Sequence, residues 1–207
     1  MSIDHVVTSG TFSLDGGTWE VDNNVWIVGD DQEVVVIDAA HDAPAILDVV
    51  AGRRVKAIIC THAHNDHVNA AGALVEATGA PVRLHPADDM LWKMVYPDAP
   101  GYAPLADGDA FTVGGIRLEV LHTPGHAPGA VCLHAPELKT VFTGDTLFQG
   151  GPGATGRSYS SFDTIIESIR GRLLSLPADT VVRTGHGDST TIGAEAPHLE
   201  EWITRGH

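Results

Sequence analysis

The sequence is poor in cysteine and in positive charge. It has 2 cysteines, and 12 lysines and arginines stand against 27 aspartates and glutamates, for a formal net charge of −15 over 207 residues. The excess negative charge is spread along the chain, which argues against nucleic acid or an anionic membrane surface as a partner. Cys60 and Cys132 lie in apolar, strand-like stretches. We therefore expect two buried thiols rather than a disulfide, as in a reducing cytoplasm.

Signals for export and membrane insertion are also missing. Residues 1–10 have neither the basic start nor the apolar core of a signal peptide. No apolar run is long enough to span a bilayer, and we find no internal repeat, low-complexity tract or linker. We therefore expect a cytoplasmic protein in which residues 1–207 form one domain with a substantial core.

Strand and helix patterns alternate through both halves of the chain. Strands are expected at residues 4–11, 18–29, 33–39, 55–60, 81–85, 111–113, 116–121, 130–134, 140–143 and 180–184, with breaks at 15–17 and 22–24. Helices are expected at residues 43–50, 68–78, 86–95, 162–176 and 194–203. Two strand-rich halves, each covered by helices, predict an α/β fold of two packed sheets with helices outside.

Two segments follow no periodic pattern. Residues 96–108 form either a wall of a substrate cleft or a simple connection, and Trp92, Tyr96 and Tyr102 accordingly either line that cleft or anchor the core. Residues 150–161 are rich in glycine and include Arg157, which would meet an anionic substrate group or lie in solvent.

Residues 61–67, Thr-His-Ala-His-Asn-Asp-His, concentrate three histidines and one aspartate between an expected strand and an expected helix. The i, i+2 spacing of His62 and His64 lets two imidazoles converge on one ion, while Asp66 and His67 point to a second position beside it. Imidazole and carboxylate are ligands that suit zinc and iron. The alternative is a polar loop without metal, but a buried group of imidazoles is costly without a partner.

Further polar residues follow the ends of other apolar strands. They are Asp38 after residues 33–37, His126 after 116–121, Asp145 after 140–143 and His186 after 180–184. Glycines beside the last three let the backbone turn sharply and bring these side chains to a common point. His41, His85 and His122 lie near these positions, and a structural role is the simpler interpretation for them.

The ordered set of histidines and aspartates resembles the metallo-β-lactamase superfamily over nearly the whole chain. The resemblance implies an αβ/βα sandwich with a dinuclear metal site at one edge. It implies that one ion is held by His62, His64 and His126, and a second by Asp66, His67 and His186, with Asp145 bridging the two. Asp38 would steady the histidine loop. The ions would be two divalent cations, zinc first, with iron or manganese also compatible.

The bridging aspartate and the segments around it narrow the resemblance to the glyoxalase II branch. Residues 144–148, the glycine-rich loop and residues 184–187 are similar to that branch. After His186 the chain has room for about one helix, whereas the larger glyoxalase II enzymes carry a C-terminal helical domain that binds glutathione. Residues 16–24 resemble an actinobacterial group linked to mycothiol. The implied substrate is a small-molecule thioester of a low-molecular-weight thiol, possible carriers including mycothiol.

The implied reaction is hydrolysis by a hydroxide shared between two ions about 3.5–4 Å apart. Asp66 would orient this nucleophile and accept its proton as well as bind metal. The competing hypothesis is a persulfide dioxygenase with one iron held by His62, His126 and Asp145. A lactonase would use the same ligand set. A nuclease fits poorly with the acidic charge, and a non-catalytic module fits poorly with seven ligands, because structural zinc sites are closed four-ligand cages.

Overall fold

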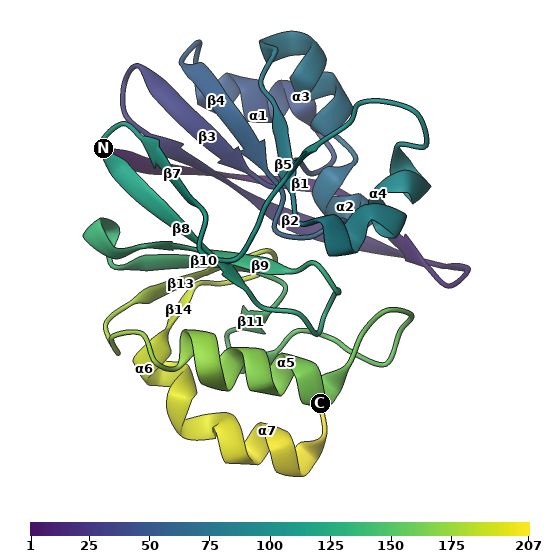
Figure 1. The fold of residues 1–207 in the computed structure, drawn as a ribbon, viewed down its shortest axis with the longest axis vertical. Helices are drawn as coiled ribbons and strands as arrows, with labels where there is room; N and C mark the ends of the chain where they lie inside the picture. Colours follow the sequence, from purple (N-terminus) through teal and green to yellow (C-terminus); the bar gives the residue numbers. More distant parts are fainter.

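Two six-stranded sheets make up the protein, and the structure, a computed structural model, describes residues 1–207 (Figure 1). In the first sheet the strands lie in chain order: β1 (Ser2–Leu14), β2 (Gly17–Gly29), β3 (Glu33–Ile37), β4 (Arg54–Ile59), β5 (Val82–Leu84) and β6 (Ala103–Pro104). The second sheet has the order β14 (Thr190–Thr191), β13 (Val181–Thr184), β10 (Thr140–Gly144), β9 (Val131–Ala135), β8 (Ile116–His122) and β7 (Ala110–Val113). β11 (Leu147–Phe148) and β12 (Gly151–Pro152) form a separate short hairpin.

Both sheets are mixed. β1, β2 and β3 pair antiparallel, whereas β3, β4, β5 and β6 run parallel. In the second sheet β7 to β10 pair antiparallel, β10 and β13 run parallel, and β14 returns antiparallel to β13. The expected pair of packed sheets is confirmed.

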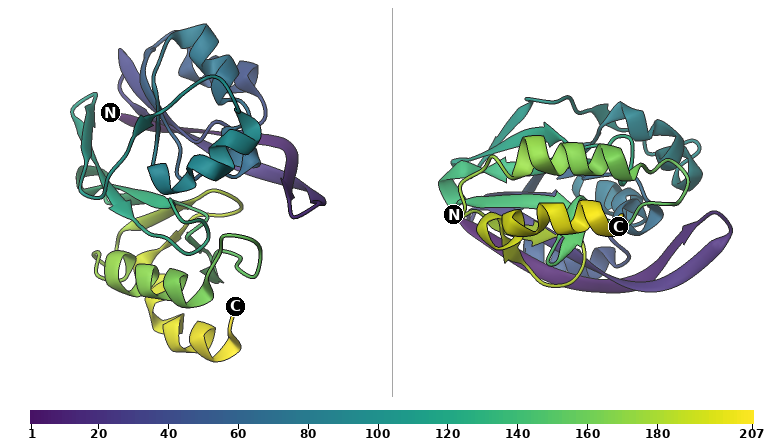
Figure 2. Two further views of the ribbon diagram at one scale, coloured as in Figure 1. Left: turned by 45° about the vertical axis from the view of Figure 1, so that its right-hand side comes forward. Right: turned by 90° about the horizontal axis from the view of Figure 1, so that it is seen from below.

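Helices cover the outer face of each sheet, so the sheets meet face to face (Figures 1 and 2). On the first sheet lie α1 (Ala43–Val50), α2 (Asn65–Val68), α3 (Ala71–Thr78) and α4 (Asp89–Val95), the last preceded by a 3₁₀ turn (Pro86–Asp88). On the second lie α5 (Phe162–Ser168), α6 (Ile192–Glu195) and α7 (Leu199–Arg205). Further 3₁₀ turns are at Pro136–Leu138 and Ala196–His198, and a π-helical turn is at Ile169–Leu173. No helix is long and apolar enough to cross a membrane.

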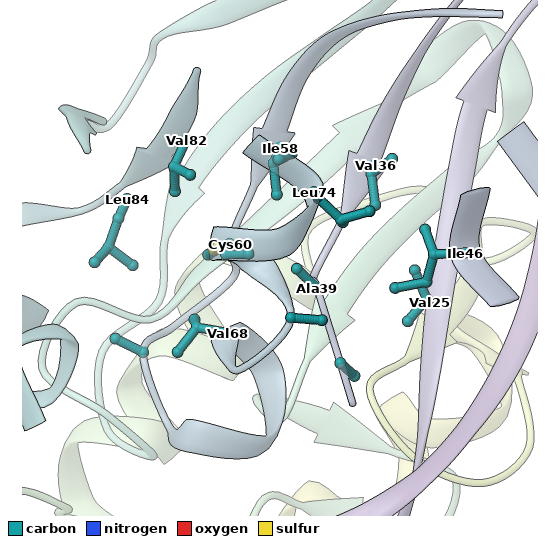
Figure 3. Close-up of a cluster of buried hydrophobic side chains, with 14 of the residues drawn as sticks. Val25, Val36, Ala39, Ile46, Ile58, Cys60, Val68, Leu74, Val82 and Leu84 are labelled. Carbon is teal, nitrogen blue, oxygen red and sulfur yellow. The ribbon is translucent and has the colours of Figure 1, made fainter. Parts of the chain in front are cut away.

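The core forms three apolar layers that follow from this arrangement. Along β3, Val34 and Val36 pack under the helices of the first sheet, in the cluster drawn in Figure 3, while Val35 and Ile37 pack between the two sheets. Side chains of a strand alternate between its faces, so a continuous apolar run fits a strand that is covered on both faces. A third cluster, which includes Trp202, lies beneath the helices of the second sheet.

Several predicted boundaries were wrong. The break predicted at residues 22–24 is absent, because β2 runs on to Gly29 with Asn23 and Asn24 buried and hydrogen-bonded. The helix predicted at 68–78 begins at Ala71 as α3, and the separate helix α2 precedes it at Asn65–Val68. Between the two helices, the side chain of Asn69 accepts a hydrogen bond from His41 N. The helix predicted at 162–176 turns π-helical after Ser168, and that at 194–203 contains a 3₁₀ turn at Pro197.

Residues 96–108 are a connection rather than a cleft wall. They add β6 to the edge of the first sheet, and Trp92 and Tyr96 pack with the core beneath the helices of that sheet. Trp92 Nε1 donates to Pro100 O at 3.2 Å, which anchors the loop. Cys60 and Cys132 are buried and free, as predicted.

Candidate metal centre

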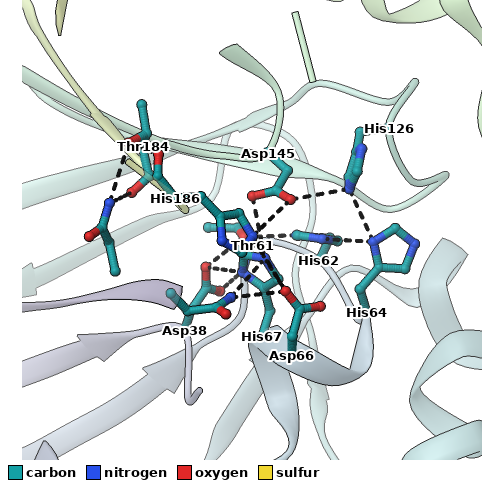
Figure 4. Close-up of polar contacts among 12 residues, drawn as sticks. Asp38, Thr61, His62, His64, Asp66, His67, His126, Asp145, Thr184 and His186 are labelled. Atoms are coloured by element: carbon teal, nitrogen blue, oxygen red, sulfur yellow. Dashed lines mark hydrogen bonds and ion pairs between the residues drawn. The ribbon is translucent and has the colours of Figure 1, made fainter. Parts of the chain in front are cut away.

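The predicted site residues come together at one edge of the sandwich, where strands of both sheets end (Figure 4). His62 and His64 follow β4, while Asp66 and His67 lie on α2. The other residues follow the ends of β3, β8, β10 and β13, namely Asp38, His126, Asp145 and His186. Backbone hydrogen bonds from Val131 N to Thr61 O and from Asn24 N to Gly185 O, each of 2.8 Å, join the two sheets beside this edge.

Three imidazoles form the first cluster, His62, His64 and His126. His64 Nδ1 lies 3.1 Å from His62 Nε2 and 3.0 Å from His126 Nε2. All three side chains are buried. One proton cannot satisfy three nitrogens that face the same point, so the cluster presents converging lone pairs.

The second cluster contains Asp66, His67 and His186. His67 Nε2 lies 3.2 Å from His186 Nε2 and 3.5 Å from Asp66 Oδ2. His186 Nε2 lies 3.3 Å from the same Asp66 oxygen. This cluster therefore mixes two imidazoles with one carboxylate.

Asp145 lies between the two clusters. Its Oδ2 is 3.4 Å from His126 Nε2 in the first cluster and 3.4 Å from His186 Nε2 in the second. Its Oδ1 is 3.3 Å from His67 Nε2. A single carboxylate thus reaches both clusters, which is the geometry that a bridging ligand requires.

Hydrogen bonds on the far side of the rings set the tautomers of three histidines. Nδ1 of His67 is 2.9 Å from Asp38 Oδ2, Nδ1 of His126 is 2.7 Å from Ala154 O, and Nδ1 of His186 is 2.7 Å from Asp22 O. Each Nδ1 must donate to its oxygen, so in the neutral ring the lone pair of Nε2 points into the site.

Asp38 holds the loop that carries the first histidines. Its Oδ1 accepts from Thr61 N at 2.7 Å, and its Oδ2 accepts from Thr61 Oγ1 at 2.9 Å as well as from His67. Thr61 Oγ1 in turn lies 3.1 Å from His62 Nδ1. Asp38 therefore holds His67 of the second cluster directly and His62 of the first cluster through Thr61.

The donor set fits divalent cations. Asp66 Oδ1, Asp145 Oδ1 and His64 Nε2 are buried and have no hydrogen-bond partner. Buried polar atoms in proteins nearly always have a partner, and a bound cation together with its coordinated water would satisfy the two carboxylate oxygens. Imidazole with carboxylate is a ligand mixture that zinc and iron both accept.

Protonation differs between the clusters. Burial, followed by the neighbouring imidazoles, lowers the pKa of His64 to about 3 and that of His62 well below its ordinary value, so both imidazoles are neutral at pH 7. Burial alone would also lower the pKa of His186. The carboxylates of Asp145 and Asp66 outweigh this effect and raise the pKa to about 10. The pKa of His67 is raised for the same reason. In the absence of metal, protons on His67 and His186 neutralise the negative charge of the neighbouring carboxylates. A cation that binds to the second cluster must displace these protons.

Gly185 permits the close approach of β13 to the site. A Cβ at this position would fall against Asp145 Oδ1 and lie 2.8 Å from His67 Cε1. Only a residue without a side chain leaves room for both groups.

A cavity of about 260 Å³ opens onto both clusters. One wall comes from the β1–β2 hairpin, with Phe12, Trp19 and Val21, and another from the glycine-rich segment, with Ala154, Arg157, Ser158 and Ser160. The Arg157 guanidinium lies 3.8 Å from the centre of the Trp19 ring, and Ser158 N donates to Asp15 Oδ2 at 3.0 Å. The cleft wall considered for residues 96–108 is therefore formed by these two segments instead.

Asn23 contributes to the site although no sequence pattern predicted it. This buried side chain donates from Nδ2 to Asp66 Oδ2 at 3.0 Å, and its Oδ1 accepts from His41 Nε2 at 2.8 Å. Two adjacent asparagines inside a strand of apolar residues were a usable signal, because buried amides need specific partners. His41 thus supports Asn23. His85 and His122 stack on each other, with ring centres 4.1 Å apart, and do not line the cavity.

Comparison with known proteins agrees with this geometry. A family model described as "Metallo-beta-lactamase superfamily" matches residues 18–186. The hydroxyacylglutathione hydrolase GloC of Haemophilus influenzae is 33% identical over 181 residues, which cover 80% of this chain and 85% of GloC. The crystal structure of TTHA1623 in a di-iron-bound form is 34% identical with a TM-score of 0.77, covering 91% of this chain and 96% of that one. The BLEG-1 B3 metallo-beta-lactamase structure is 28% identical with a TM-score of 0.75, covering 93% and 98%.

Proposed function

We propose that this chain, which belongs to the metallo-beta-lactamase superfamily, is a dinuclear metallo-hydrolase that cleaves a thioester of a low-molecular-weight thiol. The observation that carries the proposal is the position of Asp145, whose Oδ2 lies 3.4 Å from a histidine nitrogen of each cluster. The proposal is supported by the seven side chains expected as ligands, all of which belong to groups that could hold a metal ion. The similarity to GloC, a hydroxyacylglutathione hydrolase by name, supports a thioester as the substrate.

The residues divide into two positions for divalent cations. His62, His64 and His126 would hold one cation and Asp66, His67 and His186 the other, with Asp145 shared. When bound, the two cations would supply a water molecule of lowered pKa and would polarise the thioester carbonyl. Zinc is the first candidate for this ligand set, and iron, which the similar TTHA1623 structure contains, is the second.

Asp66 orients the attacking water. Asn23 and the second-cluster histidines engage its Oδ2, whereas Oδ1 is buried without a partner, and the residue lines the cavity. Burial would raise the pKa of Asp66, but the charge of His67 and the hydrogen bonds from His186 and Asn23 outweigh this effect and lower the pKa to about 2. The carboxylate is therefore ionised at neutral pH and accepts a hydrogen bond from water at Oδ1.

The leaving group needs no dedicated acid, because a thiol has a pKa of about 8.5 and departs as the thiolate. Neither cysteine serves as a nucleophile, since burial raises the pKa of Cys132 to about 11 and that of Cys60 well above its usual range. The cavity offers an apolar wall at Phe12 and Trp19 and the cation Arg157 for the remainder of the substrate.

A thioester panel tests the proposal. Metal-free protein is loaded with zinc or iron and offered acyl thioesters of glutathione, mycothiol and coenzyme A, with lactones included, and the released thiol is measured by absorbance. We expect metal-dependent thiol release, and we expect Asp145→Ala to abolish it while the circular dichroism spectrum is unchanged. The proposal fails if no thioester is cleaved, or if one iron per chain supports oxygen uptake with a persulfide instead.

A further inference from the structure

Asp88 is a buried carboxylate that belongs to neither metal cluster. It ends the 3₁₀ turn Pro86–Asp88, and its side chain is inaccessible to solvent. No lysine, arginine or histidine forms an ion pair with it; its recorded side-chain partners are two backbone amides, Ala63 N, which donates to Oδ2 at 2.9 Å, and Gly129 N, which donates to Oδ1.

These two amides belong to the two loops that carry the first cluster. Ala63 stands between His62 and His64, and Gly129 is three residues beyond His126. One carboxylate group therefore joins the backbones that position all three imidazoles, although the loops are far apart in sequence.

Gly129 shows that this contact is tightly fitted. A Cβ at residue 129 would lie 2.8 Å from Asp88 Cγ and 2.8 Å from Asp88 N, so a larger residue would push the loop away. The second cluster has separate supports, because Asp38 binds His67, Asn23 binds Asp66, and the carbonyl of Asp22 binds His186.

A space-filling role in the core does not explain why residue 88 is an aspartate, because a neutral side chain would fill the same space. Burial raises the pKa of Asp88 to about 6, although its two backbone hydrogen bonds act in the opposite direction. An ionised group in this place therefore costs folding free energy that a neutral side chain would not. The group must instead be explained by what its two oxygens hold.

We propose that Asp88 is a positioning residue for the first metal position, which sets the spacing between the His62–His64 loop and the His126 loop by accepting a hydrogen bond from each. The inference rests on the proposed function only in requiring that the two clusters bind metal. Asp88 holds the backbones of the two first-cluster loops, whereas each side chain of the second cluster has a direct partner of its own, so we expect loss of Asp88 to weaken the first position selectively.

The test isolates each metal position. In a His186→Ala background the first cluster remains complete, and in a His62→Ala background the second does. Asp88→Asn is introduced into both, and zinc binding to the metal-free proteins is measured by calorimetry with a competing chelator. The asparagine can accept from one amide but turns an NH₂ group toward the other. Asp89→Asn, whose carboxylate contacts only Lys93 and Tyr102, is the matched control.

We expect Asp88→Asn to weaken zinc binding about 10- to 100-fold in the first background and less than about twofold in the second, the range found for residues that orient metal ligands. Hydrogen exchange at the amides of Ala63 and Gly129 should speed up. Gly129→Ala should reproduce the selective loss, as a second variant that retains the carboxylate. Equal losses at both positions, or a lower melting temperature with unchanged zinc affinity, would overturn the inference. If the unmutated chain binds no metal, the proposed function fails as well.

Discussion

Replacing Gly185 by alanine should disable the metal centre through a single methyl group. The new Cβ would lie 2.8 Å from His67 Cε1 and nearer still to Asp145 Oδ1. Carbon atoms in contact normally lie about 3.5–4.0 Å apart, so the Asp145 carboxylate or the His67 ring must move by about 1 Å. The backbone at Gly185 is not left-handed, so alanine introduces only this steric conflict.

A displacement of about 1 Å at a reacting centre can reduce turnover about 100-fold, and we expect that loss in kcat/KM for thioester cleavage. The assay is thiol release by the metal-loaded variant, together with its metal content after dialysis. Gly171→Ala is the matched control, because a Cβ there meets nothing within 4 Å. Wild-type turnover and metal content in Gly185→Ala would refute the steric argument and, with it, the assigned position of Asp145.

Two further predictions concern the second cluster. Asn23→Ala removes the amide that donates to Asp66 Oδ2, so kcat at saturating metal should fall about 10-fold or more with KM retained; steady-state kinetics with metal analysis checks this, and a change in KM alone would count against it. The pKa of His186 is raised to about 10 and that of His67 is raised too, so protons compete with metal through the neutral range. Metal affinity should therefore rise from pH 6 to pH 9, with protons released on binding; calorimetry in buffers of different ionisation enthalpy measures this, and zero release would contradict it.

The residues of the candidate metal centre could be predicted as a group, because most of them follow a recognisable apolar strand. His126, Asp145 and His186 each stand next to or near a glycine at a strand end, and the structure places all of them at one edge of the sandwich. Strand ends of neighbouring parallel strands meet in space, so position along the chain predicted position in the site. The two packed sheets followed from the same patterns.

The supports of the site were less accessible to sequence reasoning. Asn23 was assigned to a break in a strand, because asparagine is rare in strands unless buried partners satisfy it. No sequence pattern predicts the role of Asp88, because its hydrogen-bond partners are backbone amides of loops that are distant in sequence. The cavity wall formed by Trp19 and Arg157 joins segments more than a hundred residues apart. Such contacts depend on tertiary packing, which local patterns do not encode.

The most direct test of the account is thioester turnover measured against equivalents of metal added to the metal-free chain. The account predicts that thiol release rises until two ions per chain are bound and that the second ion is required for most of the rate. Full activity at one iron per chain, accompanied by oxygen consumption with a persulfide and no thioester cleavage, would contradict it.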